Sequence, residues 1–189
     1  MERIFKKERP EVLNHHAALA EVVKSLRNPI PTLETNVLGT ANVLLSFGKH
    51  GRGKHRKFVF SSTGGAIYGE PKKILANEST PVVPLSPYGL SKSLGEEVIK
   101  FYARHFGFPY LIFRYPNVYG PRQNPKGEAG VVAIFGALTK AGIRPTVFGD
   151  GTKARDYVYL GDVLRANLIA HRKGVNEIVK LGWGKKVND

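Results

Sequence analysis

The sequence predicts an α/β fold in which helices cover both faces of a doubly wound parallel sheet. Short β-rich runs alternate with segments of helical apolar spacing, and this alternation continues along the whole chain. The 189 residues suffice for one domain with a buried core, and a composition of 42% hydrophobic and 23% charged residues is typical of such a domain. Neither repeats nor low-complexity segments interrupt the pattern.

The first half supplies two predicted strands and two predicted helices. The run EVLNHHAA at 11–18 has the short apolar lead of a buried strand, and a helix follows over 19–26 until NPIP ends it. A second helix is expected over 32–50, and the run KFVFSS at 57–62 is the next strand. The apolar stripe of that second helix consists of Leu33, Val37, Leu38, Ala41, Leu44 and Leu45.

The second half continues the alternation. Helices are expected over 88–107, 130–142 and 160–174, and strands over 109–115, 145–149 and 176–182. Conspicuous residues follow three of the predicted strands, in the runs HHAA, SSTGG and RYPNVYG. Because the carboxyl ends of parallel strands share one edge of a sheet, these runs are expected to converge on one ligand crevice.

The run SPYGLSK places Tyr88 four residues before Lys92, so the two side chains share a helix face. A tyrosine with a pKa near ~10 is a poor base at neutral pH, but a nearby ammonium stabilises the phenolate and lowers that pKa. Such a tyrosinate can take the proton of an alcohol while hydride leaves the carbon. Alone, the pair is more simply an aromatic and a charge at the surface.

A hydroxyl cluster lies about 25 residues upstream of Tyr88, where Thr63 or Ser62 could bond the substrate oxygen that the tyrosine deprotonates. For Ser61, Ser62 and Thr63 taken singly, a turn or cap role is the better interpretation. The two motifs together favour a catalytic site.

The formal net charge of +14 is unusual and fits nucleic acid, an acidic membrane or an anionic substrate. The basic run GKHGRGKHRK at 48–57 has no RNA-binding aromatics beside it, so a solvated loop is favoured over nucleic-acid binding. The same run imitates a phosphate-binding loop, but His55 stands where Ser or Thr is needed and a helix precedes it. That interpretation is rejected.

Other classes of site are excluded or not favoured. The absence of cysteine excludes disulfides and thiolate metal sites, and it favours a cytoplasmic location. His15 and His16 have no further ligand at metal-binding spacing, so no metal is expected. No apolar run reaches the ~18–20 residues that span a bilayer, and the charged start lacks the apolar core of a signal peptide.

Six runs, in this order, resemble the extended short-chain dehydrogenase/reductase family, in its NAD-dependent epimerase/dehydratase branch, and are most similar to UDP-glucose 4-epimerases. They are NHHAALAEVVKSLRNP, NVLGTANVL, FVFSSTGGAIYGE, SPYGLSK, RYPNVYGPRQNPKGEAGVVAIF and VFGDGTKARDYVYLGDV. The resemblance covers almost the whole chain and implies a Rossmann-like sheet with NAD as cofactor.

The resemblance also implies a role for individual residues. Tyr88 matches the catalytic base, Lys92 its partner, which also holds the nicotinamide ribose, and Thr63 the catalytic hydroxyl. The positions implied for NAD are His16, Ala17, Ala18, Leu19, Asn36, Ser61, Tyr88, Lys92 and Pro116. Those implied for the nucleotide-sugar are Thr63, Asn117, Gly130, Val131, Thr146, Phe148 and Arg155.

The implied reaction is epimerisation of a nucleotide-sugar through transient oxidation at C4. Gly64 and Gly65 stand where dehydratases carry an acidic pair, which favours an epimerase. The implied partner is a second copy of the chain, joined through the helix that begins at Tyr88. Which nucleotide-sugar is bound stays open.

The glycine-rich fingerprint G-x-x-G-x-x-G of the family is absent from the sequence. We therefore expect residues 1–115 to form a partial NAD-binding Rossmann domain. Residues 116–189 are expected to form a partial substrate lobe with returning Rossmann elements. By itself, such a chain is expected to lack turnover; the alternative is a non-catalytic remnant that retains a UDP-sugar or protein-binding surface.

Overall fold

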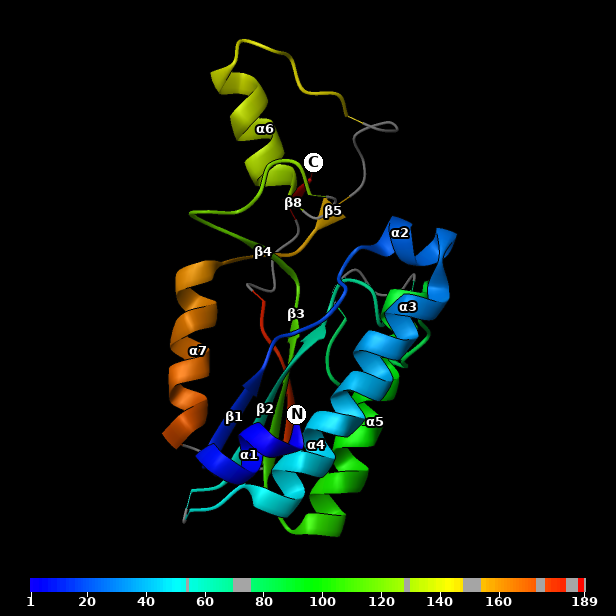
Figure 1. The fold of residues 1–189 in the computed structure, drawn as a ribbon. Coiled ribbons are helices and arrows are strands. Elements are labelled where there is room, and N and C mark those ends of the chain that lie inside the picture. The colour runs from blue at the N-terminus through cyan, green and yellow to red at the C-terminus, as the bar shows by residue number, and fades with distance from the viewer. Residues whose placement is uncertain are drawn as a thin grey trace.

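A four-stranded parallel sheet forms the centre of the protein (Figure 1). The computed structural model describes residues 1–53, 55–69, 76–127, 130–147, 154–172, 176–182 and 187–188. The strands are β1 (Val12–His15), β2 (Lys57–Thr63), β3 (Tyr110–Tyr115) and β7 (Glu177–Lys180), in the order β1-β2-β3-β7. All three pairings are parallel, which confirms the predicted α/β sheet.

Helices cover both faces of this sheet, so the doubly wound arrangement is confirmed. Figure 1 shows α4 (Gly39–His50) and α5 (Pro87–Phe106) on one side and α7 (Leu160–Arg172) on the other. The short helix α1 (Glu2–Glu8) packs against α4 through an edge contact between Phe5 and Phe47.

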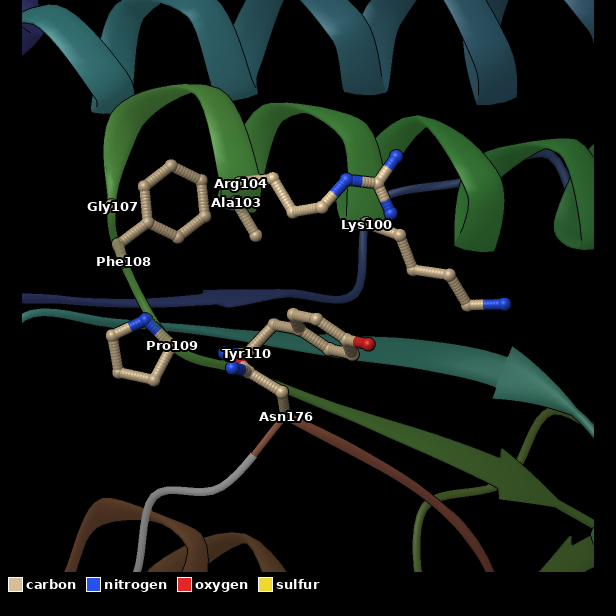
Figure 2. A pocket seen from close by; sticks show the side chains of 8 residues that line it. All are labelled: Lys100, Ala103, Arg104, Gly107, Phe108, Pro109, Tyr110 and Asn176. Carbon is tan, nitrogen blue, oxygen red and sulfur yellow. Dashed lines mark hydrogen bonds between the residues drawn. The ribbon is translucent and has the colours of Figure 1, made fainter.

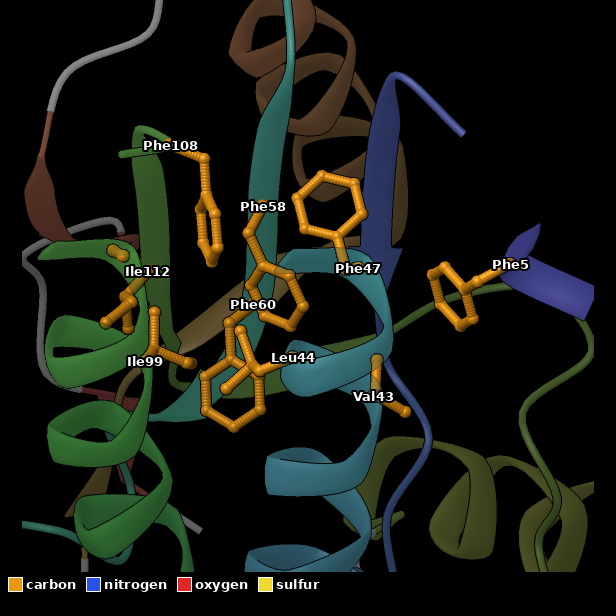
Figure 3. Packing of buried hydrophobic residues seen from close by; sticks show 10 residues of the cluster. Phe5, Val43, Leu44, Phe47, Phe58, Phe60, Ile99, Phe108 and Ile112 are labelled. Atoms are coloured by element: carbon orange, nitrogen blue, oxygen red, sulfur yellow. The ribbon is translucent and has the colours of Figure 1, made fainter. Parts of the chain in front are cut away.

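Alternate residues of β2 and β3 supply two separate cores, because successive strand side chains point to opposite faces. Phe58, Phe60 and Ile112 meet the helices α4 and α5 in a core rich in phenylalanine (Figure 3). Val59, Leu111, Phe113 and Tyr115 point the other way and pack with α7. Burial on both faces explains why these strands read as continuous apolar runs in the sequence.

The helix expected over 32–50 is a composite. After α2 (Val22–Arg27), the chain enters α3 (Pro29–Leu33), then a π-helical turn η1 (Glu34–Leu38), and then α4. Pro29 and Pro31 explain the new start, since proline is tolerated in the first helical turn, where its missing N–H has no partner to lose. Apolar spacing does not reveal the π turn.

The second half adds pairs of short strands that the sequence did not predict. The strands β4 (Asn117–Tyr119) and β6 (Tyr157–Tyr159) pair in parallel, and β5 (Ala154–Arg155) pairs with β8 (Val187–Asn188). The helix α6 (Val131–Lys140) lies beyond the carboxyl ends of the central strands (Figure 1).

One predicted strand is wrong. Residues 145–147 of the run expected at 145–149 are irregular, and 148–149 lie outside the described residues. Pro145 cannot donate to a strand ladder, and Val147 is 45% exposed, so neither backbone nor side chain has the environment of a buried strand. The helix α7 and the strand β7 follow residue 115 in the sequence, but they pack on and within the central sheet, as returning elements would. The division into two domains at residue 115 stays a prediction.

The ends of α5 are fixed by caps, which matters because its first turn carries Tyr88. The Ser86 hydroxyl accepts from the Gly89 N–H at 3.1 Å, and Pro87 occupies the first helical turn. Gly107 ends the helix in the left-handed region, at φ 66°. Among the described residues, no helix combines the length and apolarity needed to cross a bilayer.

Candidate active site

The three predicted runs do meet at the carboxyl edge of the sheet. Thr63 at the end of β2 is in register with Tyr115 at the end of β3. The His16 ring, just past β1, lies 6.0 Å from the Tyr115 ring. Tyr88 in the first turn of α5 reaches this edge, since its side chain has a hydrogen bond with Thr63, and its N–H donates to the buried Ser25 hydroxyl of α2 at 3.2 Å. The expected convergence at one sheet edge is therefore confirmed, and its role as a ligand crevice stays a prediction.

Lys92 lies beside this edge of the sheet, next to the end of β2, and is only 3% exposed. Its ammonium donates to the Ser61 carbonyl at 2.7 Å and lies 4.8 Å from the centroid of the Phe60 ring. Burial lowers the pKa of Lys92 to about 8, and the Glu96 carboxylate opposes this by favouring the charged form. The side chain is thus mainly cationic at neutral pH. Ser61 enters the site through its backbone carbonyl.

Thr63 is bound so that its hydroxyl must donate. Its Oγ1 accepts from the N–H groups of Gly65 and Ala66, at 3.2 Å each. A hydroxyl has two acceptor positions and one proton, so these contacts use both acceptor positions and leave the proton free to donate. A side-chain hydrogen bond with Thr63 lowers the pKa of Tyr88. The turn role expected for a single threonine and the catalytic role are therefore compatible.

The effect of Lys92 on Tyr88 differs from the sequence-based expectation. Burial raises the pKa of Tyr88, and the opposing contribution comes from Thr63, not from the ammonium. The expectation that the neighbouring cation lowers this pKa is wrong for the chain without ligands. The reason is that Lys92 shares a helix face with Tyr88 but turns its ammonium to the Ser61 carbonyl and the Phe60 ring.

The segment predicted to pass over the dinucleotide is held by Asn36. Of His16, Ala17, Ala18 and Leu19, only Ala18 is half-buried, and the other three are exposed. The Leu19 N–H donates to the Asn36 side-chain oxygen at 2.8 Å, and the amide nitrogen donates to the Leu19 carbonyl and to Ser91. Asn36 lies in the π turn η1 and is 2% exposed, so it ties this segment to α5. Direct contact of Asn36 with a cofactor stays a prediction.

His15 is a buried neutral group of the site wall. Its Nε2 lies 3.0 Å from the Thr40 hydroxyl, and its ring stacks on Phe60 at 5.8 Å. Burial, with smaller contributions from Lys92 and His16, lowers the pKa of His15 to about 4. Within the part of the chain that the structure describes, no three His, Asp or Glu residues are grouped to hold a metal.

The residues predicted to hold the nucleotide-sugar lie beyond the sheet edge. Pro116 joins β3 to β4, and Asn117 in β4 bonds the Asp156 carbonyl through its N–H at 3.0 Å. This contact brings the neighbouring Arg155, which is exposed, next to β4. Gly130 and Val131 form the start of α6, Thr146 is exposed, and Phe148 lies outside the described residues. Their contact with a substrate stays a prediction.

Sequence reasoning missed a buried ion pair behind Lys92. Glu96 on α5 and Arg114 on β3 are 1% and 3% exposed and form a two-pronged contact. The available signal was an arginine inside the apolar run PYLIFRY, together with a carboxylate four residues after Lys92.

An open hollow of about 510 Å³ lies at the opposite end of the sheet (Figure 2). Its walls include Lys100 and Arg104 near the end of α5 and Tyr110 at the start of β3. Because ligands of doubly wound sheets bind at the carboxyl edge, this hollow is not the candidate active site.

Comparison with known proteins agrees with this geometry. The pattern of the NAD dependent epimerase/dehydratase family matches residues 1–182. A putative UDP-glucose 4-epimerase of Methanocaldococcus jannaschii is 50% identical over 178 residues, which are 94% of this chain and 57% of that protein.

Two solved structures share the fold closely. The crystal structure of UDP-glucose 4-epimerase with UDP-glucose from Thermotoga maritima superposes with a TM-score of 0.94 at 48% identity, over 99% of this chain and 60% of that one. The UDP-glucose 4-epimerase of Thermus thermophilus in complex with NAD superposes with a TM-score of 0.90 at 41% identity. The match covers 99% of this chain and 61% of that one. The chain thus spans 57% to 61% of the length of these relatives.

The first prediction concerns acid stability. The folded-state pKa of His15, about 4, lies below its ordinary value of 6.5, so the stability it supports is present above pH 6.5 and is lost as the pH falls toward 4. The loss amounts to at most about 3 kcal/mol. Thermal unfolding between pH 7 and pH 4 should show a smaller decrease in His15→Gln than in the wild-type chain. The exposed His105→Gln is the control, and an equal pH dependence in all three chains would contradict the prediction.

The second prediction concerns the Thr63 hydroxyl. Thr63→Val should raise the pKa of Tyr88 further, because the hydrogen bond that lowers it is lost. Thr63→Ser should leave it nearly unchanged. The chain has 8 tyrosines, so the signal of Tyr88 must be separated from the others. Phenolate absorbance is titrated in each variant with and without Tyr88→Phe, and the difference between the two curves is the titration curve of Tyr88. Identical midpoints in the Val and Ser variants would show that the hydroxyl does not act on the phenol.

Proposed function

Since the chain belongs to the NAD dependent epimerase/dehydratase family, we propose that it acts in the 4-epimerisation of a UDP-hexose, of the UDP-glucose and UDP-galactose class. The observation that carries the proposal is the convergence of Lys92, Thr63 and the Tyr88 turn at the carboxyl edge of β2. A phenol, a hydroxyl donor and a fixed ammonium are the groups needed to move a proton from and to a sugar hydroxyl.

The residues present fit NAD at its nicotinamide end. Tyr88, Lys92 and the segment 16–19 would hold it, and Asn36 keeps that segment against α5 through Leu19 and Ser91. The buried Lys92 ammonium suits ribose hydroxyls, since it already donates to a backbone oxygen at the crevice floor. When bound, NAD supplies a hydride acceptor that also returns the hydride.

The chain's own part in the reaction is proton transfer and orientation. Tyr88 takes the proton of the 4-hydroxyl and later returns it, while the Thr63 hydroxyl donates a hydrogen bond to the same sugar oxygen. The cationic Lys92 lies one helical turn from Tyr88 and favours its charged form once substrate and cofactor displace water. Asn117 and the planar fork of Arg155 are proposed for the nucleotide diphosphate.

Epimerisation is favoured over dehydration by the two glycines after Thr63. Elimination of water needs an acid or base near the sugar, and Gly64 and Gly65 supply none. The space also matters, because a side chain at position 64 would come within 3.2 Å of the Arg114 carbonyl. The turn is therefore too tight for a carboxylate at that position without a shift of backbone.

A second candidate is a non-catalytic protein that binds a nucleotide-sugar. Its support is the absence of the family's glycine-rich fingerprint from the sequence. The cytoplasmic location expected from the sequence is proposed together with the epimerase function.

The third prediction separates these two candidates. Calorimetric titration with UDP-glucose should show binding, and conversion of UDP-glucose to UDP-galactose with added NAD measures turnover. If turnover occurs, Tyr88→Phe should lower it by at least about 100-fold and leave UDP-glucose binding within about twofold. The control is Tyr110→Phe, in the distant hollow.

The outcomes are distinct. Turnover that survives in Tyr88→Phe would refute the assigned base. Binding without turnover in the wild-type chain supports the second candidate. Absence of UDP-glucose binding overturns both.

The fourth prediction concerns a homodimer, proposed from the outer face of α5. Leu90, Leu94 and Phe101 are 41%, 40% and 56% exposed and fall on one stripe of this helix, and Leu38 at the end of η1, just before the neighbouring α4, is 60% exposed. Such an apolar patch is typical of a subunit interface. Phe101→Arg should shift sedimentation from dimer to monomer, while Leu168→Arg on the exposed face of α7 should not. A wild-type chain that sediments as a monomer at micromolar concentration would contradict the proposal.

A further inference from the structure

The face of α5 that carries Tyr88 and Lys92 continues into a third group, Glu96. The three residues are spaced by four and therefore lie one above another on the helix. Glu96 is 1% exposed, and its carboxylate accepts from Arg114 Nε at 3.0 Å, Arg114 Nη2 at 2.6 Å and the Ser62 hydroxyl at 2.5 Å. One carboxylate thereby ties α5 to both β2 and β3.

Arg114 is fixed in turn by Tyr68. Its Nη1 donates to the Tyr68 hydroxyl at 3.0 Å, and the guanidinium lies 5.2 Å from the centroid of the Tyr68 ring. Hydrogen bonds to Glu96 and Tyr68 raise the pKa of Arg114, so it stays cationic under all ordinary conditions. The carboxylate is therefore held in a closed, buried ion pair.

Stability alone is a weak reason for such a pair. Well-packed apolar residues of similar volume hold buried elements together as well or better, because a buried ion pair must offset the loss of hydration of both ions. What an apolar replacement could not supply is negative charge one helical turn below Lys92. That charge is the property to explain.

Building on the proposed function, we propose that Glu96 is a positioning residue that keeps Lys92 cationic in the crevice while Arg114, Ser62 and Tyr68 hold the carboxylate in place. The carboxylate does not touch the reacting groups and acts through Lys92. A neutral amine in that place would donate fewer hydrogen bonds, and it could not favour the phenolate form of Tyr88 once substrate and cofactor displace water.

Among the groups around Lys92, Glu96 is the one that opposes the lowering of the Lys92 pKa by burial. From β2 the ammonium faces the Ser61 carbonyl and the Phe60 ring, and from the β1 side it faces His15 and His16. His15, with a pKa of about 4, is neutral at pH 7. On α5 the neighbours are the neutral Tyr88 phenol and Glu96, and Glu96 raises the pKa of Lys92 against burial.

The test follows the titration of Lys92 in the chain without substrate or cofactor. Lysine labelled with ¹⁵N at the side chain is observed by NMR from pH 5 to pH 10, and the Lys92 signal is identified by its loss in Lys92→Met. The wild-type midpoint should lie at about 8. Glu96→Gln, which keeps the shape and removes the charge, should lower this midpoint by roughly one pH unit.

A matched control lies on the same helix. Glu97→Gln removes a carboxylate that is exposed and pairs with Lys100 at 2.6 Å, and it should leave the Lys92 midpoint unchanged. A merely structural role of Glu96 predicts a lower melting temperature with an unchanged Lys92 midpoint, and that result would overturn the proposal.

A double variant covers the case in which Glu96→Gln does not fold, since it leaves the Arg114 cation buried alone. Glu96→Gln with Arg114→Gln leaves no unpaired charge, and the Lys92 midpoint should again fall, by less than in Glu96→Gln because the Arg114 cation is removed together with the carboxylate. An unchanged midpoint in the folded double variant would also refute the proposal. Neither measurement uses UDP-glucose or NAD. This inference can therefore fail while the epimerase proposal stands, and the epimerase proposal can fail while this inference stands.

Discussion

The candidate site depends on one buried contact, in which Glu96 joins α5 to the neighbouring strands β2 and β3. Its partners, Ser62 and Arg114, are themselves directly paired across the sheet. The residues proposed to carry the chemistry are adjacent, since Ser61 and Thr63 flank Ser62 while Lys92 lies one turn before Glu96. A helix that slid by one turn along the sheet would move Lys92 away from the Ser61 carbonyl, and the closed geometry of the ion pair prevents that movement.

Much of the fold was predictable because its central strands are buried on both faces. Apolar runs such as KFVF are unambiguous in that setting, and each ends in residues of the site. The short strands β4 and β6 were not predictable, since three residues carry no periodicity, and the π turn at Asn36 has the same apolar spacing as an ordinary helix. The Glu96–Arg114 pair could be recognised only in the folded structure, because its members are 18 residues apart on different elements.

The pKa of Tyr88 could not be predicted from residue spacing alone. A separation of four residues places two side chains on one face, but the direction of a long lysine chain is chosen by its other partners. Here a backbone carbonyl and an aromatic ring hold the ammonium, and desolvation of the phenol then exceeds what Thr63 contributes in the opposite direction. The phenol is thus protonated at neutral pH in the ligand-free chain, and the role of base proposed for it requires that binding change its surroundings.

Some of the residues behind the net charge of +14 lie in the last turns of helices. The last turns of α1, α4 and α5 carry Lys6 and Lys7, Lys49 and His50, and Arg104 and His105. Cations at these positions offset the partial negative charge of helix carboxyl termini. In α4 and α5 the chain then turns into β2 and β3, so these charges gather near the amino ends of the strands, away from Thr63. At the opposite edge, two buried cations, Lys92 and Arg114, accompany the one buried carboxylate of Glu96, so the proposed recognition of an anionic ligand there rests on individually directed groups rather than on the overall positive charge.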